Sequence, residues 1–480
     1  MVAAFWIALV CAWIAYMYFT KNNKAVDLPG PGGLPFVGCL FQLDKRFHLI
    51  LYKYAEKYGK AVYFKIFNEH FVTINDAKMG KELFSMDQLS GRPVFDAFLL
   101  YEGEKLGVVN SEGQLWETHR RFTLRQLRDF GFGKNTMEML IMDEVNDFAE
   151  RIKNAKGAPV GEIKKLLSLA VVNSLWTIVS GKRYSQDDAN LKAISNSLDR
   201  ALSASADTGG IVFFMPWLRY IMPEYTGYAA TRRAFEQLRA FVEDSVKEHQ
   251  KTFKPDVIRD FIDVYLKEMH SVTDPKSTFY GKEGGTDTTS TTLAWAILYL
   301  ATHPEVQKKL QAEISSITAD SRDVSVADRS SMPYSQATIE EVFRMSSILP
   351  NGVQHQVLTD VTFQGTLLPK GTMVSMNAFY IHYDPALWDE PAKFKPERFL
   401  VDNGKAFKKS DHVVPFSIGK RHCLGESLAR DTIFLFLTNI VKNFNVECDP
   451  SNPNPTLEPA IGFTLNPQEY SVIFKVRGKV

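Results

Sequence analysis

The stretch of sequence that decides the fold lies near the C-terminus, at residues 416–425. It reads Phe416-Ser417-Ile418-Gly419-Lys420-Arg421-His422-Cys423-Leu424-Gly425. Its cysteine stands on a basic turn between two glycines. The whole chain has four cysteines in 480 residues and no C-x-x-C pair, which excludes a disulfide scaffold. Cys423 is therefore either a structural cysteine beside a basic turn or a thiolate that carries chemistry.

This stretch resembles the cysteine loop of the haem-thiolate monooxygenases, the cytochrome P450 superfamily. A lone structural cysteine does not require the five matching positions, which are Phe416, Gly419, Arg421, Cys423 and Gly425. The resemblance implies haem b (iron protoporphyrin IX) with Cys423 as the axial thiolate, on a loop whose amides point at the sulfur. It also implies that Phe416 shields the ligand from water and that Arg421 neutralises a haem propionate. Gly419 and Gly425 would permit the tight backbone beneath the porphyrin.

An acid and a base share one face of a predicted helix over Tyr334–Met345. Glu341 and Arg344 are three residues apart, and such a pair alone is usually an exposed ion pair worth little. Arg398 lies in a Pro-Glu-Arg-Phe segment 25 residues before Cys423. The resemblance implies that Glu341, Arg344 and Arg398 form a buried network bracing the cysteine loop, with a structural rather than catalytic role.

Two further segments match the family's haem-propionate contacts. Trp116 and Arg120 are four residues apart, so an indole donor and a guanidinium share one helix face. His355 matches the propionate-contacting position that follows the bracing helix. An isolated Trp-x-x-x-Arg pattern is common by chance, and its weight comes from the other matching motifs.

The segment Gly284-Gly285-Thr286-Asp287-Thr288-Thr289 matches the family's oxygen-activating pattern. An adjacent acid and alcohol, Asp287 and Thr288, can relay protons through water during oxygen activation. The local sequence alone favours an ordinary helix N-cap at Thr286 or Asp287. The resemblance favours oxygen activation.

The sequence departs from the family directly before this motif. The family's distal helix is long and apolar, yet residues 273–285 contain a proline, three glycines and charges without apolar periodicity. About 12–16 residues, or three to four helical turns, are missing near 275–285. Two explanations stand open: an exon lost from a splice form or gene model, which the intact flanks favour, and a protein with a broken distal wall.

The N-terminus predicts a membrane anchor. Residues 2–20 carry no charge, and nineteen residues span about 28 Å as a helix. A cleaved signal peptide would need a basic region before a shorter apolar core. Lys21 and Lys24 follow the run, so the positive-inside rule places the rest of the chain in the cytosol. Residues 21–35 then form a basic flank and a proline-rich hinge.

The remainder reads as one mainly α-helical unit with small β-sheets, an α+β cytochrome P450 fold over residues 36–480. Apolar residues recur at helical spacing in 140–165 and 228–270, and β-rich runs occupy 60–75, 357–375 and the C-terminus. Pro369-Lys370-Gly371-Thr372 is typical of a hairpin corner. A net charge of +1 argues against nucleic-acid binding. No Gly-rich nucleotide fingerprint follows a strand, which is consistent with the separate electron donor that the resemblance implies.

Several softer signals concern substrate and partners. Six residues are substrate-pocket candidates by their position relative to the family's motifs: Phe95, Phe98, Leu349, Val353, Ile461 and Phe463. The set is apolar, which implies a lipophilic substrate, although each residue alone could serve in core packing. The apolar connection 211–221 suits either a membrane-interface loop or plain burial. Near the cysteine-ligand face of the family's fold, four cations could dock an acidic reductase or simply be solvated: Arg120, Arg121, Arg125 and Arg128.

The resemblance thus implies a monooxygenase of the microsomal drug- and lipid-oxidising clan, anchored in the endoplasmic reticulum membrane. It would insert one oxygen atom from O₂ into a xenobiotic, fatty acid or steroid-like molecule. Electrons would come from NADPH through a flavoprotein reductase, with cytochrome b5 as a further partner. One alternative is a catalytically impaired haem-binding isoform, because half of the distal helix is missing. The other is a haem-thiolate isomerase or dehydratase, against which the Asp287-Thr288 pair argues.

Overall fold

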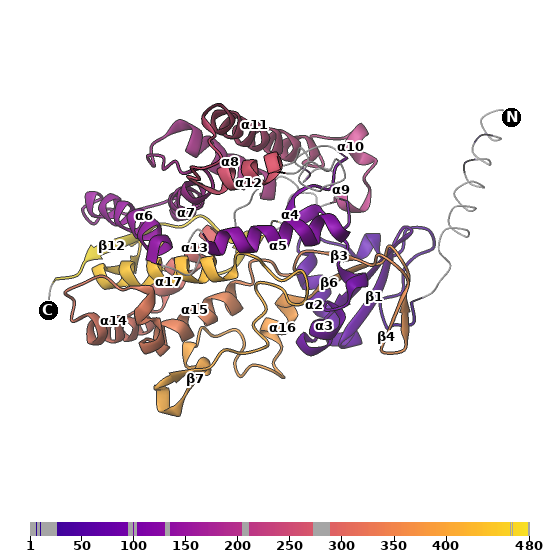
Figure 1. The fold of residues 1–480 in the computed structure, drawn as a ribbon. Helices are drawn as coiled ribbons and strands as arrows, with labels where there is room; N and C mark the ends of the chain where they lie inside the picture. Colours follow the sequence, from indigo (N-terminus) through magenta and orange to yellow (C-terminus); the bar gives the residue numbers. More distant parts are fainter. Residues whose placement is uncertain are drawn as a thin grey trace.

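The computed structural model describes residues 26–94, 99, 103–129, 135–203, 211–271, 289–460, 462 and 464–478, together with Trp6 and Val10. Several expected features lie outside these residues: most of the anchor 2–20, the segment 275–285, Asp287, Thr288, Phe95, Phe98, Ile461 and Phe463. The described chain is mainly helical with small sheets, as the sequence predicted (Figure 1).

The helices of the described chain are α2 (Phe47–Tyr58), α3 (Ala77–Leu83), α4 (Gly107–Asn110), α5 (Gly113–Asp129), α6 (Asn135–Asn154), α7 (Ile163–Ser180), α8 (Ala189–Ser203), α9 (Ile211–Phe214), α10 (Leu218–Ile221), α11 (Tyr228–Thr252), α12 (Phe261–Ser271), α13 (Thr289–Thr302), α14 (Pro304–Thr318), α15 (Pro333–Ser346), α16 (Ala378–Tyr383) and α17 (Glu426–Asn443). Short 3₁₀ turns are η1 (Leu40–Gln42), η2 (Asp87–Leu89), η5 (Val326–Ser331), η6 (Pro396–Phe399) and η7 (Asp402–Gly404). In Figure 1, α13 and α17 cross the middle of the molecule, with α8, α11 and α12 above and α14 and α15 below.

Two apolar stretches are each split into two helices. The run predicted over 140–165 ends at Asn154 and resumes at Ile163, because Gly157 takes φ of 80° and Pro159 follows. The run over 228–270 is interrupted at 253–260, where Pro255 removes a backbone donor.

Within the described residues the strands form one four-stranded sheet and four two-stranded ones. The large sheet has the order β1-β2-β6-β3, from β1 (Ala61–Ile66), β2 (Glu69–Ile74), β3 (His355–Gln356) and β6 (Met373–Met376), with β2 and β6 parallel. The other pairs are β4 (Val361–Phe363) with β5 (Thr366–Leu368), β7 (Leu400–Val401) with β8 (Ala406–Phe407), β9 (Phe444–Cys448) with β12 (Val472–Val476), and β10 (Pro459–Ala460) with β11 (Asn466–Pro467).

The turn at Pro369–Thr372 is present but is not a hairpin corner. The Thr372 amide donates to the Pro369 carbonyl at 3.1 Å, and Gly371 takes φ of 90°. The strands on either side, β5 and β6, belong to different sheets. The expectation of a hairpin was therefore wrong, because local turn residues do not specify which strands pair.

Helix α13 is the centre of the core. From Ser290 to Ala301 every residue is buried, and the helix packs against α7, α15 and α17. The indole of Trp295 donates to the Leu465 carbonyl at 2.9 Å, and the Tyr470 hydroxyl donates to the Ala294 carbonyl at 2.6 Å. The C-terminal strands thus hold the downstream half of this helix in place.

The proline-rich segment lies against the large sheet. The Tyr63 amide of β1 donates to the Pro29 carbonyl at 2.9 Å, and the Cys39 amide donates to the Lys65 carbonyl at 2.7 Å. A Cβ on Gly30 would lie 1.7 Å from the Tyr63 carbonyl oxygen, so this position accepts only glycine. Residues 29–39 are therefore docked on β1.

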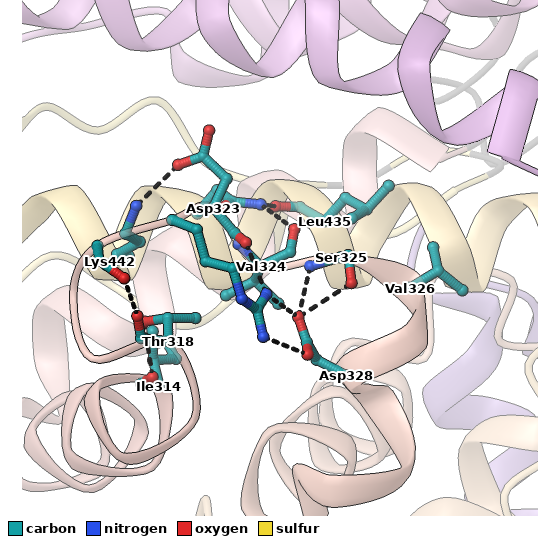
Figure 2. Close-up of polar contacts among 12 residues, drawn as sticks. Ile314, Thr318, Asp323, Val324, Ser325, Val326, Asp328, Leu435 and Lys442 are labelled. Atoms are coloured by element: carbon teal, nitrogen blue, oxygen red, sulfur yellow. Dashed lines mark hydrogen bonds and ion pairs between the residues drawn. The ribbon is translucent and has the colours of Figure 1, made fainter.

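The loop between α14 and η5 is fastened to α17, the helix that follows the cysteine loop (Figure 2). Asn439 of α17 accepts a hydrogen bond from the Val324 amide at 2.9 Å, and Lys442 pairs with Asp323 at 2.8 Å. Ser325 and Asp328 close a capping box on η5. These bonds connect the far end of α17 to the rest of the helical layer.

Among the described residues, α7 is long and apolar enough to cross a membrane. Its residues Leu167, Ala170 and Val171 belong to the main hydrophobic cluster. Helix α7 therefore has the burial of a core helix, and it is not the predicted anchor, which precedes residue 21.

Candidate haem site

The cysteine loop crosses directly over the end of α3. Gly419 takes φ of 78°, and a Cβ there would lie 2.3 Å from the Phe84 carbonyl oxygen. The Lys420 amide donates to that same carbonyl at 3.0 Å. Only glycine fits this left-handed, close-packed position. At Gly425 φ is −91°, and a Cβ would meet no protein atom within 4 Å.

Solvent reaches the Cys423 thiol in this structure. Its side chain is exposed, whereas Cys39 is buried and Cys448 is half-buried. Burial by the surrounding atoms raises the pKa of the Cys423 thiol, while a hydrogen bond from the Gly425 amide and the Arg120 charge act in the opposite direction. An accessible sulfur with an amide and a cation beside it has the features that stabilise a thiolate ligand.

Phe416 begins the loop and contacts the helix that braces it. The Cys423 amide donates to the Phe416 carbonyl at 2.9 Å, which closes the loop on itself. The Phe416 ring packs edge-on against Phe343 of α15, with centroids 5.1 Å apart. The half-buried aromatic ring therefore links the backbone at the cysteine to α15.

A buried ion-pair network lies behind the loop. Both side chains of the Glu341–Arg344 pair are fully buried, with Nε–Oε2 and Nη2–Oε1 distances of 2.7 and 2.8 Å. Arg398 Nε donates to Glu341 Oε1 at 3.1 Å, and the Lys395 amide donates to the same oxygen at 2.8 Å. Both carboxylate oxygens are satisfied, as burial of a charge requires.

The arginines of this network also hold backbone carbonyls of the segment 382–393. Arg344 Nη1 donates to the His382 and Pro391 carbonyls at 2.6 and 2.8 Å, and Arg398 Nη2 donates to the Lys393 carbonyl at 3.1 Å. His382 continues the chain: its Nε2 accepts from the Val414 amide at 2.9 Å. The path from Glu341 thus reaches the irregular segment that leads into the cysteine loop.

Three arginines gather on the other side of the loop, where Trp116 contacts two of them. The Arg421 and Arg120 guanidinium carbons lie 4.0 and 5.8 Å from the indole centroid. All three guanidiniums donate to backbone carbonyls. Arg421 donates to the carbonyls of Ser90, Val108 and Ser111, and Arg120 donates to that of His422. Arg92 donates to the carbonyls of Val109, Val353 and Gln354. Within the described part of the chain, none of these three guanidiniums has a carboxylate within ion-pair distance.

This arrangement concentrates positive charge in a buried place. Burial and the Arg120 charge lower the pKa of Arg92 to about 10. Burial and the charges of Arg92 and Arg120 lower the pKa of Arg421 to about 9. Three like charges in one recess are unfavourable unless an anion joins them.

Arg92 was not identified from the sequence. It stands between Gly91 and Pro93 with no charge pattern around it, and an isolated bridge between Gly91 and Gln356 brings it beside His355. That bridge joins segments more than 260 residues apart, so no local signal could place Arg92 in this cluster.

His355 belongs to β3, the edge strand of the large sheet, beside the cations. Its Nδ1 lies 2.7 Å from the Leu89 carbonyl, which can only accept, so Nδ1 donates. Burial and the charges of Arg92 and Arg421 lower the pKa of His355 to about 3, so the ring is neutral at pH 7. Only Nε2 remains to meet a haem carboxylate, and such an anion would favour its protonation.

The residues present fit a haem. The indole Nε1 of Trp116 is buried and has no hydrogen-bond partner in the described structure, which marks a donor that awaits an acceptor. Beside it lie the three carboxylate-free guanidiniums, and the accessible Cys423 thiol follows in the same loop as Arg421. Two propionates would satisfy the donors and cations, and a thiolate would satisfy the iron.

On the distal side the structure describes the helix from Thr289 onward. The Ser290 hydroxyl bonds to that of Ser168 on α7 at 2.9 Å, and Thr291 donates to Asn466 at 3.0 Å. These bonds fix the first described turn of α13 between α7 and the C-terminal strands. The pair Asp287–Thr288 directly precedes this turn in sequence.

Two of the pocket candidates are described, and both are half-buried. The Val353 carbonyl accepts from Arg92 Nη1 at 3.3 Å, so Val353 borders the cation cluster. Leu349 follows Ile348, whose carbonyl accepts from the Leu465 amide at 2.9 Å. The C-terminal segment therefore contacts the loop after α15. The sequence analysis assigned residues of these two segments to one pocket.

Comparison with known proteins agrees with this geometry. The family model described as Cytochrome P450 matches residues 28–474. Cytochrome P450 2J5 of Mus musculus is 35% identical over 98% of this chain and 97% of its own length, and Cytochrome P450 2J2 of Homo sapiens is 37% identical over 94% and 91%. Farnesoate epoxidase of Bombyx mori is 31% identical over 98% of both chains.

Proposed function

Because this chain belongs to the cytochrome P450 family, we propose that it oxidises a lipophilic small molecule at a haem held by Cys423. The enzyme is a monooxygenase whose haem carries a cysteine thiolate ligand and receives electrons from a redox partner. When bound, the thiolate-ligated haem activates O₂ for insertion of one oxygen atom. The observation that carries the assignment to Cys423 is its accessible thiol beside three carboxylate-free guanidiniums.

The proximal residues divide into two tasks. Trp116, Arg120, Arg421 and His355 bind and orient the haem propionates, and Arg92 joins them. Phe416 and Gly419 keep the loop closed, the Gly425 amide bonds to the sulfur, and Phe416 would shield the ligand from water once haem is bound. The buried ion-pair network has a structural task, which is to hold that loop against α15. It consists of Glu341, Arg344 and Arg398.

The distal residues move protons and receive the substrate. The Asp287 carboxylate takes up a proton from solvent, and the Thr288 hydroxyl passes it to the oxygen-binding side of the haem. A pocket lined by Phe95, Phe98, Leu349, Val353, Ile461 and Phe463 would exclude water and favour an apolar substrate. The silkworm relative's name states that it epoxidises farnesoate, which supports a lipophilic substrate for this chain.

A membrane would deliver such a substrate. We assign residues 2–20 to an anchor in the endoplasmic reticulum membrane, with 36–480 as a cytosolic catalytic domain. In the connection 211–221, Trp217, Tyr220 and Ile221 are 51%, 75% and 68% exposed, so plain burial does not explain their apolar character. Aromatic and aliphatic residues exposed together suit the membrane interface.

The redox partner is an NADPH-dependent flavoprotein reductase, with cytochrome b5 as a second donor. On α5, Arg125 and Arg128 are exposed, Arg121 pairs with Glu117 at 3.0 Å, and Arg120 turns inward to the His422 carbonyl. The two exposed cations without such bonds are the better candidates to meet an acidic partner.

The test is oxidation by the full chain in reductase-containing vesicles, with NADPH and isotopically labelled O₂, over a panel of fatty acids, steroids and xenobiotics. The proposal expects one labelled oxygen atom in the product. Product that forms without O₂ or NADPH would instead support the isomerase or dehydratase alternative.

One observation favours a second candidate, a haem-binding isoform with impaired turnover. The alignment with the mouse relative extends over 499 positions, more than the 480 residues of this chain, so at least 19 positions have no counterpart here. Residues 273–285 lack the apolar periodicity of the family's distal helix. Two results together would support this candidate. The chain would bind haem without forming labelled product, and insertion of the relative's distal-helix segment would restore product formation.

A further inference from the structure

Glu340, the neighbour of Glu341 on α15, belongs to a second buried ion-pair chain. Its side chain is fully buried, and its Oε2 accepts from Arg430 Nη1 of α17 at 2.8 Å. Arg430 Nε donates to Glu426 Oε1 at 2.7 Å. The single guanidinium of Arg430 therefore bridges two carboxylates, one on α15 and one at the start of α17.

The same guanidinium touches the aromatic residue that begins the cysteine loop. Its central carbon lies 4.8 Å from the Phe343 ring centroid and 5.2 Å from that of Phe416. A cation over two ring faces attracts both rings. Arg430 thus supports Phe416 from the side of α17, while Phe343 supports it from α15.

Glu426 brings a negative charge close to the ligand cysteine. It is the first residue of α17, directly after Gly425, whose amide bonds to the Cys423 sulfur. Its carboxylate also pairs with His422 Nε2 at 2.6 Å and with Lys409, an exposed lysine, at 3.1 Å. Only Leu424 and Gly425 stand between Cys423 and Glu426 in the chain, so this carboxylate belongs to the immediate surroundings of the cysteine loop.

We propose that Arg430 is a positioning residue that neutralises Glu426 beside the thiolate and thereby sets the reduction potential of the haem iron. The inference rests on Cys423 as the ligand. One electron from the redox partner converts ferric to ferrous iron, and an uncompensated negative charge nearby stabilises the ferric form. Arg430 and Lys409 together oppose the Glu426 charge, and loss of Arg430 leaves less positive charge beside that carboxylate, so the iron accepts the electron at a higher potential with Arg430 in place.

Arg430 must act through both its charge and its shape. A lysine would keep the charge but could not hold Glu340 and Glu426 from one planar group while covering two rings. One oxygen of Glu340 and Nη2 of Arg430 have no partner in the described structure, so the guanidinium is held by one hydrogen bond on each side. Its position therefore depends on the two carboxylates together.

The experiment measures the haem reduction potential by spectroelectrochemical titration of the full-length holoenzyme. The variants are Glu426→Gln, Arg430→Gln, their double variant and Arg430→Lys. Arg329→Gln is the matched control, because Arg329 pairs with Asp431 of α17 at 2.7 Å and lies 4.7 Å from the Phe434 ring. The carbon monoxide difference spectrum reports thiolate ligation in parallel.

We expect opposite shifts. Arg430→Gln lowers the potential, Glu426→Gln raises it, the double variant returns toward the parent value, and the control does not move. Arg430→Lys should keep most of the potential while losing part of the thiolate-ligated fraction. A role in packing alone would not give shifts of opposite sign.

Potentials that stay at the parent value in both single variants, with thiolate ligation intact, would overturn the proposal. If Arg430→Gln cannot retain haem, Glu426→Gln decides alone, and a potential that fails to rise refutes the inference. A parent protein without thiolate ligation would overturn the Cys423 assignment and this proposal together, whereas failure of the inference alone leaves the parent spectrum intact.

Discussion

Two sets of arginines lie on opposite sides of the cysteine loop, and they differ in their partners. The carboxylate-paired set, Arg344, Arg398 and Arg430, contacts Glu341, Glu340 and Glu426. The carboxylate-free set consists of Arg92, Arg120 and Arg421, which donate to backbone carbonyls. Each arginine of the paired set has a carboxylate partner without any ligand, so this set holds the loop in place. In the carboxylate-free set no guanidinium pairs with a carboxylate within the described structure, so this set suits an anionic ligand.

The largest effect should come from breaking the paired set. Glu341→Gln leaves Arg344 and Arg398 without their shared, fully buried carboxylate. Removing one partner of a buried ion pair costs about 3–5 kcal/mol. We expect urea unfolding to show a loss of this size, with little holoprotein recovered. Glu117→Gln, which breaks the exposed pair with Arg121, is the control and should cost less than about 1 kcal/mol. Equal losses in the two variants would contradict the contrast.

Changing the carboxylate-free set should affect haem rather than folding. Arg421→Met removes one of three like charges, which offsets part of the cost of leaving the Ser90, Val108 and Ser111 carbonyls without this donor, so the apoprotein should lose clearly less stability than Glu341→Gln. Loss of a charge-assisted hydrogen bond of about 1.5–3 kcal/mol should weaken haem binding about 10- to 100-fold. Haem transfer to apomyoglobin measures the retention. An apoprotein destabilised as strongly as Glu341→Gln would remove the distinction between the two sets.

A histidine stands beside each set, and both should make the protein sensitive to acid. Burial, followed by nearby arginine charge, lowers the pKa of His355 and of His382 to about 3. The unfolded chain takes up these protons near pH 6.5, and the folded chain does not. Stability is therefore complete above about pH 6.5 and falls by up to about 1.4 kcal/mol per pH unit for each histidine at lower pH.

Haem binding should change the pKa of His355 but not that of His382. A propionate beside His355 would restore its pKa, whereas His382 lies in the paired network through the Ser347 hydroxyl and the Val414 amide. Unfolding free energies measured from pH 7 to 5 should therefore fall more steeply in apoprotein than in holoprotein. Equal slopes would show that no carboxylate of the haem reaches His355.

The smallest effect should come from the exposed arginines of α5. Arg125→Glu and Arg128→Glu lie outside both sets, so thiolate ligation and unfolding should remain at parent values. We expect the KM for the reductase to rise, more at low than at high ionic strength, because the interaction is electrostatic. A change in the haem spectrum of these variants would place them in the site instead.

Much of this contrast could be predicted from sequence, because local spacing carries the motifs. Cys423 with its glycines, Glu341 with Arg344, and Trp116 with Arg120 are each readable within ten residues. The breaks after Asn154 and Thr252 were missed because apolar periodicity continues across them, although Pro159 and Pro255 marked the positions.

What the sequence could not supply is long-range pairing. Arg92 enters the cation cluster through the bridge between Gly91 and Gln356, and nothing in its local sequence indicates that. For Arg430, the sequence spacing can indicate one of its two ion pairs, because Glu426 stands four residues before it on α17. Its second partner, Glu340, is brought in by packing of α15 on α17, which spacing along one helix cannot reveal.

The most direct test of the account is the reduced carbon monoxide difference spectrum of the full chain and of Cys423→Ser, with Cys448→Ser as the matched control. The account predicts a Soret band at about 450 nm, the band that gives the family its name, in the parent and the control but not in Cys423→Ser. A parent without this band, or a Cys423→Ser protein that keeps it, would contradict the assignment of the haem ligand.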